Sequence, residues 1–218
     1  MNHRNSQKRL RVDEGIFALT VNTKNRYPYF QETIFCELFI EQLRICKQAR
    51  KFRLYGFSLM PDHFHMMIHP GEGENISRVM HFLKRHVSRE INIFMGYERN
   101  PHAALAANHQ DDKNGKDDQD GKDDQDGEDD QDGEDIDPRL QEGVYTISES
   151  GDRYPRLLTT PKFSWQPSFH DHLIRDERDF QNQLRYIWWN PEKHGVIEDF
   201  TQYTFSSFRH HQDLIDLI

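Results

Sequence analysis

The sequence has few cysteines and no long hydrophobic run, and each shortage excludes a class of protein. Only Cys36 and Cys46 occur in 218 residues. Both fall in one segment of helical periodicity and point in different directions, so we expect no disulfide framework and a reducing cytoplasm. Hydrophobic residues make up 35% of the chain, and no apolar run approaches the roughly 18–20 residues that a membrane helix needs. The basic N-terminus lacks the apolar region of a secretory signal.

The net charge of −9 arises from one short stretch. Residues 109–138 contain 15 acidic residues and 3 lysines, and they repeat a hexapeptide as GKDDQD, GKDDQD and GEDDQD. Such a segment buries nothing that would offset the entropy of ordering it, so we expect a disordered acidic insertion. An acidic metal-binding strip is the alternative, although the positions of an EF-hand do not recur. The remaining 188 residues carry 25 Lys and Arg against 22 Asp and Glu, so the folded body is mildly basic.

The rest of the chain indicates one domain of strands and helices. We expect a basic arm at 1–12 and a single domain at 13–218 that the insertion interrupts, because neither flanking stretch is self-sufficient. Apolar periodicity predicts strands at 16–23, 52–59 and 63–69, with short β-like pieces within 143–165. It predicts helices at 31–50 and 175–190, and a further helix that begins at Asn75 or Ser77 and ends at about 94. The last helix should end near Asn190, because Pro191 disfavours helical geometry in the residue before it. This order predicts an α+β fold, an antiparallel sheet covered by helices in the ferredoxin-like manner.

Helical and strand spacing also predicts which apolar side chains form the core. One face of each predicted element carries them. They are Phe17, Leu19 and Val21; Phe35, Leu38, Phe39, Leu43 and Cys46; Val79, Phe82, Leu83 and Val87; and Phe180, Leu184 and Ile187.

His63 and His65 form the first candidate site, on the predicted strand 63–69. Successive strand side chains alternate between faces, so the two histidines share one face while Phe64 turns to the core. Their Cα atoms would lie roughly 7 Å apart, close enough for two imidazoles to bind one divalent ion. The alternative is that both histidines line the solvent face of a half-buried strand.

Tyr186 and Asn190 form the second candidate site, on the last predicted helix. Positions i and i+4 lie on one helix face, a turn apart. Tyr186 is offset from the apolar stripe, which leaves its hydroxyl available as a nucleophile. The alternative is a boundary tyrosine whose hydroxyl contacts water. We expect at least one of Trp188 and Trp189 to pack the helix onto the sheet; stacking on bases is the alternative.

Basic residues gather where a polyanion could bind. Arg78, Lys84, Arg85 and Arg89 occupy the outer side of the helix predicted to end near 94, and the arm at 1–12 adds further cations. A solvated helix face is the alternative interpretation. A basic body with such clusters indicates nucleic acid as a ligand.

Three ordered blocks of this sequence resemble the REP-associated tyrosine transposases, a branch of the HUH single-tyrosine, IS200-like transposases. The first block runs from Leu59 through Pro61-Asp62-His63-Phe64-His65 and resembles the HUH signature, in which U is a bulky hydrophobe. The second spans 165–172 and 174–177, and the third runs from Tyr186 to Pro191 and on through Lys193, His194 and Gly195. The segments 20–30 and 203–207 also fit, so the resemblance covers nearly all the chain except the arm and residues about 96–150.

The resemblance implies specific roles for these residues. His63 and His65 would bind a divalent metal, Mg²⁺ or Mn²⁺, with Asn190 completing the site and Tyr186 as the nucleophile. The implied reaction is cleavage and joining of single-stranded or hairpin DNA through a 5′-phosphotyrosine, by a monomer or homodimer associated with the nucleoid. Trp188 stands where the branch often has His, and the acidic repeat is not a family feature.

Two other functions stay open at this point. One is a catalytically inactive DNA-binding or regulatory protein that keeps the transposase fold. The other is a metal-dependent hydrolase that draws further ligands from His69, His170, His172 or His194, although their spacing matches no hydrolase signature.

Overall fold

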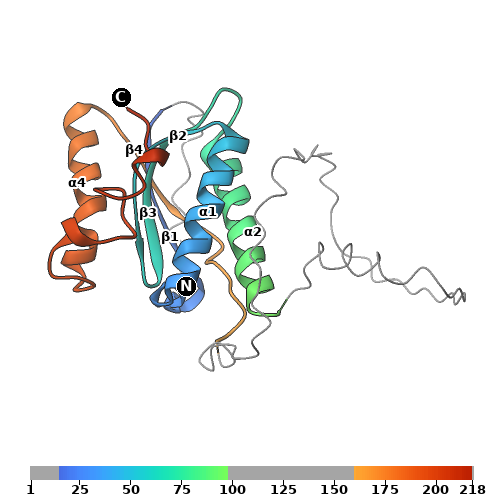
Figure 1. The fold of residues 1–218 in the computed structure, drawn as a ribbon. Helices are drawn as coiled ribbons and strands as arrows, with labels where there is room; N and C mark the ends of the chain where they lie inside the picture. The colour runs from blue at the N-terminus through green and yellow to red at the C-terminus, as the bar shows by residue number, and fades with distance from the viewer. Residues whose placement is uncertain (1–14, 98–159, 218) are drawn as a thin grey trace, which may run out of the picture. The chain divides into compact units, whose positions relative to one another are not determined.

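The computed structural model describes residues 15–97 and 160–217, and within them it shows a four-stranded antiparallel sheet with three α-helices (Figure 1). The predicted arm at 1–12 and the acidic insertion at 109–138 lie outside the described residues. The strands and helices are, in chain order, β1 (Phe17–Asn22), α1 (Thr33–Arg50), β2 (Arg53–Met60), β3 (His63–His69), α2 (Ile76–Phe94), β4 (His170–Leu173) and α4 (Glu177–Lys193). The sheet order is β2-β3-β1-β4. The predicted α+β fold is therefore confirmed.

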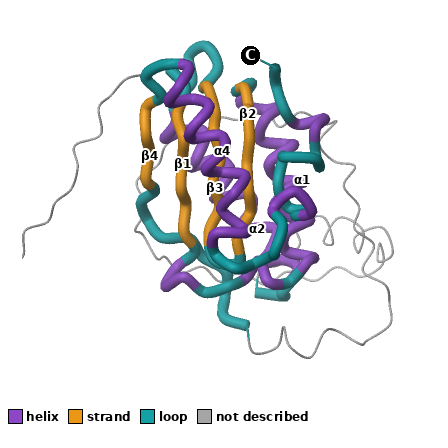
Figure 2. Tube along the Cα trace, turned by 90° about the vertical axis from the view of Figure 1, so that its left-hand side faces the viewer, coloured by secondary structure: helices purple, strands orange, loops and turns teal. Residues whose placement is uncertain are grey.

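The helices cover the two faces of the sheet unequally. Helices α1 and α2 lie on one face and α4 lies on the other (Figures 1 and 2). Strand alternation assigns the side chains of β3 to these faces: the Phe64 ring packs 4.8 Å from the Phe39 ring of α1, whereas Met67 packs against α4 in a cluster with Phe180 and Leu184. His63 and His65 have the parity of Met67, so they face α4.

Most of the predicted core is buried, including Cys46. Cys36 is buried as well, and both cysteines are free thiols. The α2 helix begins after Asn75, whose side-chain oxygen accepts from the backbone N–H of Arg78 at 3.0 Å and so caps the helix as predicted. Phe82 is an exception. It is only half-buried, with the Arg50 guanidinium 4.5 Å from its ring centroid, because it lies at the rim of the helix layer and not under it.

Two predicted boundaries are wrong for identifiable reasons. The α4 helix does not end at Asn190 but runs through Pro191 to Lys193. Pro191 stands in the last turn, so its missing N–H costs the helix one terminal hydrogen bond, while the N–H of His194 still donates to the carbonyl of Asn190 at 3.0 Å.

The fourth strand lies further along the chain than predicted. Around Trp165 the structure has only an isolated bridge to Thr23, and β4 is the segment His170–Leu173. This strand escaped prediction because it lies at the sheet edge with its first two residues exposed, so its side chains show little apolar alternation. Backbone pairing with β1 holds it in place.

Asn92 clamps together two points of the chain that the sequence separates widely. Its side-chain NH₂ donates to the carbonyl of Phe163 at 3.1 Å, and its oxygen accepts from the N–H of Phe163 at 2.8 Å. The chain therefore returns beside the end of α2 after the long stretch that begins at 98.

Gly56 lies where β2 approaches α4 most closely. A Cβ at this position would come 2.4 Å from Cδ1 of Leu184 and 3.4 Å from Nε1 of Trp188. Because Gly56 has no side chain, α4 can pack closely against β2 at this position.

We expect Gly56→Ala to destabilise the protein by about 1–3 kcal/mol, because the added methyl overpacks this contact. Chemical denaturation should show the loss. The double variant Gly56→Ala/Leu184→Ala should be less destabilised than the sum of the two single changes, because shortening Leu184 makes room. Additive losses would contradict this account.

Candidate active site

His63 and His65 converge on a single point on the face that α4 covers. Their ring centroids lie 4.9 Å apart, and the two Nε2 atoms approach to 3.1 Å. Each residue is only 5% exposed. The alternative that they line a solvent-facing strand is therefore wrong, since the pair is buried under α4.

Each imidazole is held through its other nitrogen. The Asp62 carboxylate accepts from Nδ1 of His63 at 2.6 Å, and Arg26 in turn contacts Asp62 at 3.1 Å. Nδ1 of His65 lies 2.8 Å from the Thr20 hydroxyl. With Asp62 as the acceptor for Nδ1–H, Nε2 of His63 keeps a free lone pair, which is the tautomer a metal ligand needs. The Thr20 hydroxyl can accept from Nδ1 of His65 in the same way, so both Nε2 atoms can serve as ligands at one point.

The sequence alone did not reveal these supporting residues. Asp62 enters the sequence analysis only within the block that resembles the HUH signature, and Thr20 only within the predicted strand 16–23 and the segment 20–30. The available signal was a carboxylate directly beside a candidate ligand histidine, the usual partner of a metal-binding imidazole.

Burial keeps the histidine pair neutral. It lowers the pKa of His65 to about 3, helped by the neighbouring His63, while the adjoining Asn190 side chain opposes the shift. Burial also lowers the pKa of His63, and Asp62 partly offsets that effect. Neutral imidazoles are the form that binds metal.

Helix α4 brings Tyr186 and Asn190 to the histidine pair. The Tyr186 ring centroid lies 5.6 Å from that of His65, with the rings nearly perpendicular. Asn190 is completely buried. Its NH₂ donates to the backbone carbonyl of Tyr186 at 3.2 Å, and its Oδ1 has no hydrogen-bond partner among the described residues.

Lys193 and His194, at the end of α4, lie close to Tyr186 and the histidine pair. The Lys193 ammonium lies 4.8 Å from the centroid of the Tyr186 ring, and the His194 ring lies 6.1 Å from that of His63. The sequence marked Lys193 as part of a motif, and His194 both there and among the ligands of the hydrolase alternative. Their position about two helical turns beyond Tyr186 is the signal that could have placed them near it.

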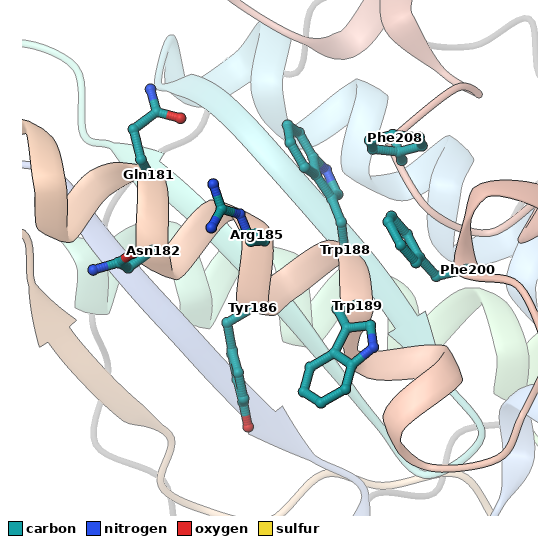
Figure 3. Close-up of a pocket in the computed structure, with 8 residues that line it drawn as sticks. All are labelled: Gln181, Asn182, Arg185, Tyr186, Trp188, Trp189, Phe200 and Phe208. Carbon is teal, nitrogen blue, oxygen red and sulfur yellow. The ribbon is translucent and has the colours of Figure 1, made fainter.

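An open groove of about 620 Å³ begins at Tyr186 and follows the outer side of α4. It is lined by Gln181, Asn182, Arg185, Tyr186, Trp188, Trp189, Phe200 and Phe208. Tyr186 and Trp189 project to the same side of the helix, whereas Trp188 turns toward Phe208 (Figure 3). Trp188 donates to the Ser207 hydroxyl at 3.0 Å, so it is the packing tryptophan, and Trp189 remains 41% exposed.

The four cations predicted to bind DNA do not join this site. Arg78, Arg85 and Arg89 are exposed on α2, in the layer on the other face of the sheet. The Lys84 ammonium donates to the carbonyls of Gln166 at 2.7 Å and Pro167 at 3.2 Å, and so fastens the segment leading to β4.

The donors at the site fit a divalent cation. In an octahedral metal site, two neighbouring nitrogen ligands each lie about 2.1 Å from the metal, and the N–metal–N angle is a right angle. The two nitrogens are then about 3.0 Å apart, which is close to the 3.1 Å between the two Nε2 atoms. The buried, unpartnered Oδ1 of Asn190 supplies an oxygen. Within residues 15–97 and 160–217 there is no cluster of three or more His, Cys, Asp or Glu that could hold a metal, so the described chain offers no ligand set for the hydrolase alternative.

Comparison with known families identifies one class of protein that part of the chain resembles. Residues 12–103 match the model of the IS200-like transposase family. None of the helices in the described part of the chain is long and apolar enough to cross a membrane.

Within that class the similar proteins are REP-associated tyrosine transposases. The chain is 48% identical over 50 residues to one assigned in Haemophilus influenzae and 40% identical over 50 residues to one from Escherichia coli K12. These matches cover 23% of the chain, and they span only 27% and 29% of the two relatives. A solved REP-associated tyrosine transposase bound to a REP hairpin shares the fold, with a TM-score of 0.55 at 19% identity over 94% of this chain and 82% of that one. The resemblance found in the sequence is thereby confirmed.

We expect the metal-free protein to lose stability as the pH falls from about 6.5 toward 3. In that window the unfolded chain binds a proton at His65 that the folded protein excludes, so protonation favours unfolding. Thermal unfolding in chelator should show a falling midpoint for wild type and a flatter profile for His65→Leu. Equally steep profiles for the two proteins would contradict the assignment.

Proposed function

We propose that the chain is a metal-dependent DNA strand transferase that cleaves single-stranded or hairpin-bearing repeat DNA through a 5′-phosphotyrosine. One observation carries the proposal: the Tyr186 phenol lies against a buried imidazole pair that comes from a strand about 120 residues earlier. An exposed phenol beside neutral metal ligands suits attack on a phosphodiester better than it suits a structural role. The relatives' names support the same chemistry.

His63, His65 and Asn190 would hold Mg²⁺ or Mn²⁺. When bound, the cation withdraws negative charge from a non-bridging phosphate oxygen and fixes the geometry of attack. Asp62 would keep His63 in the metal-binding tautomer, and the Thr20 hydroxyl would accept from Nδ1 of His65 when the metal is bound. Burial lowers the pKa of His65, so at neutral pH its ring is unprotonated and can bind the metal.

Tyr186 would form the covalent bond. Its oxygen attacks the phosphorus and releases the phenolic proton to solvent, while the P–O3′ bond breaks and the leaving 3′ oxygen takes up a proton from solvent. The products are a 5′-phosphotyrosine and a free 3′-OH. Because one phosphodiester replaces another, the 3′-OH of a second end can reverse the step and join strands.

The groove beside Tyr186 would receive the nucleotides that flank the scissile phosphate. The exposed indole of Trp189 offers a stacking surface for a base, and Arg185 and Lys193 add positive charge on the same helix. Arg78, Arg85 and Arg89 would contact the DNA backbone beyond the cleavage site. Lys84 would act indirectly, through the segment it fastens.

We expect wild type to form a covalent adduct with a labelled hairpin that carries single-stranded flanks, in Mn²⁺ and not in EDTA. Tyr186→Phe should bind the hairpin and give no adduct on a denaturing gel. Tyr97→Phe is the matched control, because it removes a similarly exposed hydroxyl at the end of α2. Hairpin binding by wild type without an adduct under any divalent ion would instead identify an inactive regulatory protein.

Removing the charge of Lys193 should slow adduct formation while leaving hairpin binding nearly intact. We expect Lys193→Gln to be roughly 10- to 100-fold slower at saturating DNA, since a charged contact to the reacting phosphate is worth ~1.5–3 kcal/mol. Single-turnover rates would measure this, with Lys193→Arg retaining most of the rate. Arg178→Gln removes an exposed charge from the first turn of the same helix and should have no effect. Equal slowing in both glutamine variants would contradict a local role.

A further inference from the structure

A second buried amide oxygen lies beside the histidine pair. Asn22 is the last residue of β1 and pairs directly with His63 in the register of β1 and β3. Directly paired residues of antiparallel strands present their side chains on the same face, at Cβ separations of about 4.5–5.5 Å. The adjacent pair shows this face, because the Thr20 hydroxyl reaches Nδ1 of His65. Asn22 therefore projects into the layer that His63 and His65 occupy.

The Asn22 amide is buried and only half satisfied. The residue is 7% exposed, and its Oδ1 has no hydrogen-bond partner among the described residues. Its NH₂ donates toward Oε1 of Gln166 at 3.4 Å. Gln166 also donates its backbone N–H to the carbonyl of Asn22 at 2.9 Å, so Gln166 contacts both the backbone and the amide NH₂ of Asn22. The register places the Asn22 side chain on the face that carries His63 and His65, and its amide oxygen accepts from none of the described residues.

A buried acceptor without a partner destabilises the folded protein, because it loses its hydrogen bond to water and gains none in return. The Asn22 oxygen therefore needs a physical explanation. Asn22 and Asn190 show the same pattern: each has a buried amide oxygen without a hydrogen-bond partner among the described residues, and each uses its NH₂ elsewhere. Asn22 pairs with His63 in the sheet, and the Asn190 side chain adjoins His65. Mg²⁺ and Mn²⁺ prefer oxygen ligands, and two imidazoles alone make a nitrogen-rich site for them.

We propose that Asn22 contributes a second amide oxygen to the divalent cation held by His63, His65 and Asn190, with Gln166 as its positioning residue. The inference rests on the proposed metal dependence and adds a protein ligand to it. The inference also gives a role to the hydrogen bond from the Lys84 ammonium to the carbonyl of Gln166. That bond holds Gln166 in place, and Gln166 orients the Asn22 amide.

The test is Mn²⁺ binding to the DNA-free protein, measured by isothermal titration calorimetry together with the thermal midpoint in chelator. We expect Asn22→Leu to weaken Mn²⁺ binding at least 10-fold and to leave the metal-free midpoint unchanged or higher, because it removes an unsatisfied polar group. Asn22→Asp should bind Mn²⁺ as tightly as wild type or more tightly. Ser58→Ala is the matched control: it deletes another buried, unpartnered oxygen, on the β2 side of His65, and should leave the affinity unchanged.

The outcomes separate this inference from the proposed function. Mn²⁺ binding that His63→Ala abolishes but Asn22→Leu leaves intact would overturn the role of Asn22 and keep the metal site. An equal loss in Asn22→Leu and Ser58→Ala would also overturn it, since the effect would then be general. Absence of Mn²⁺ binding by wild type, or binding that His63→Ala does not alter, would overturn the metal site itself and Asn22 with it.

Discussion

The packing of α4 onto the sheet determines whether the residues of the candidate site meet. Leu184 and Ile187 bury themselves against Tyr55 and Met67, and this contact sets the rotation of the helix about its axis. Once Ile187 faces the sheet, the neighbouring Tyr186 must lie at the border of the contact, toward His65. The same apolar contact that completes the fold thus brings Tyr186 to the histidine pair.

Much of this arrangement could be predicted, because it depends on short-range periodicity. Alternation along a strand places His63 and His65 on one face, and helical spacing places Tyr186 and Asn190 together. Neither pattern says which face of the sheet a distant helix will cover. The approach of Tyr186 to His65 was therefore implied by the family resemblance and not by the pattern of residues.

The features that escaped prediction share a physical origin. The edge strand β4 is held by backbone pairing that leaves little trace in its side chains. The role of Asp62 depends on the rotamer of a turn residue, and Pro191 is tolerated because it falls in the final helical turn. The cations of α2 illustrate a further limit: periodicity predicted their exposure, but exposure does not specify on which side of a layered domain a charge will lie.

The Asn92 clamp has a consequence for how such a chain can evolve. It pins Phe163 beside the end of α2, so the architecture requires only that the polypeptide leave and re-enter at two neighbouring points. The entropic cost of joining two fixed points grows with the logarithm of the number of intervening residues, about 0.6 kcal/mol for each doubling. Adding or deleting whole GKDDQD units between these two points therefore changes the stability of the fold by little.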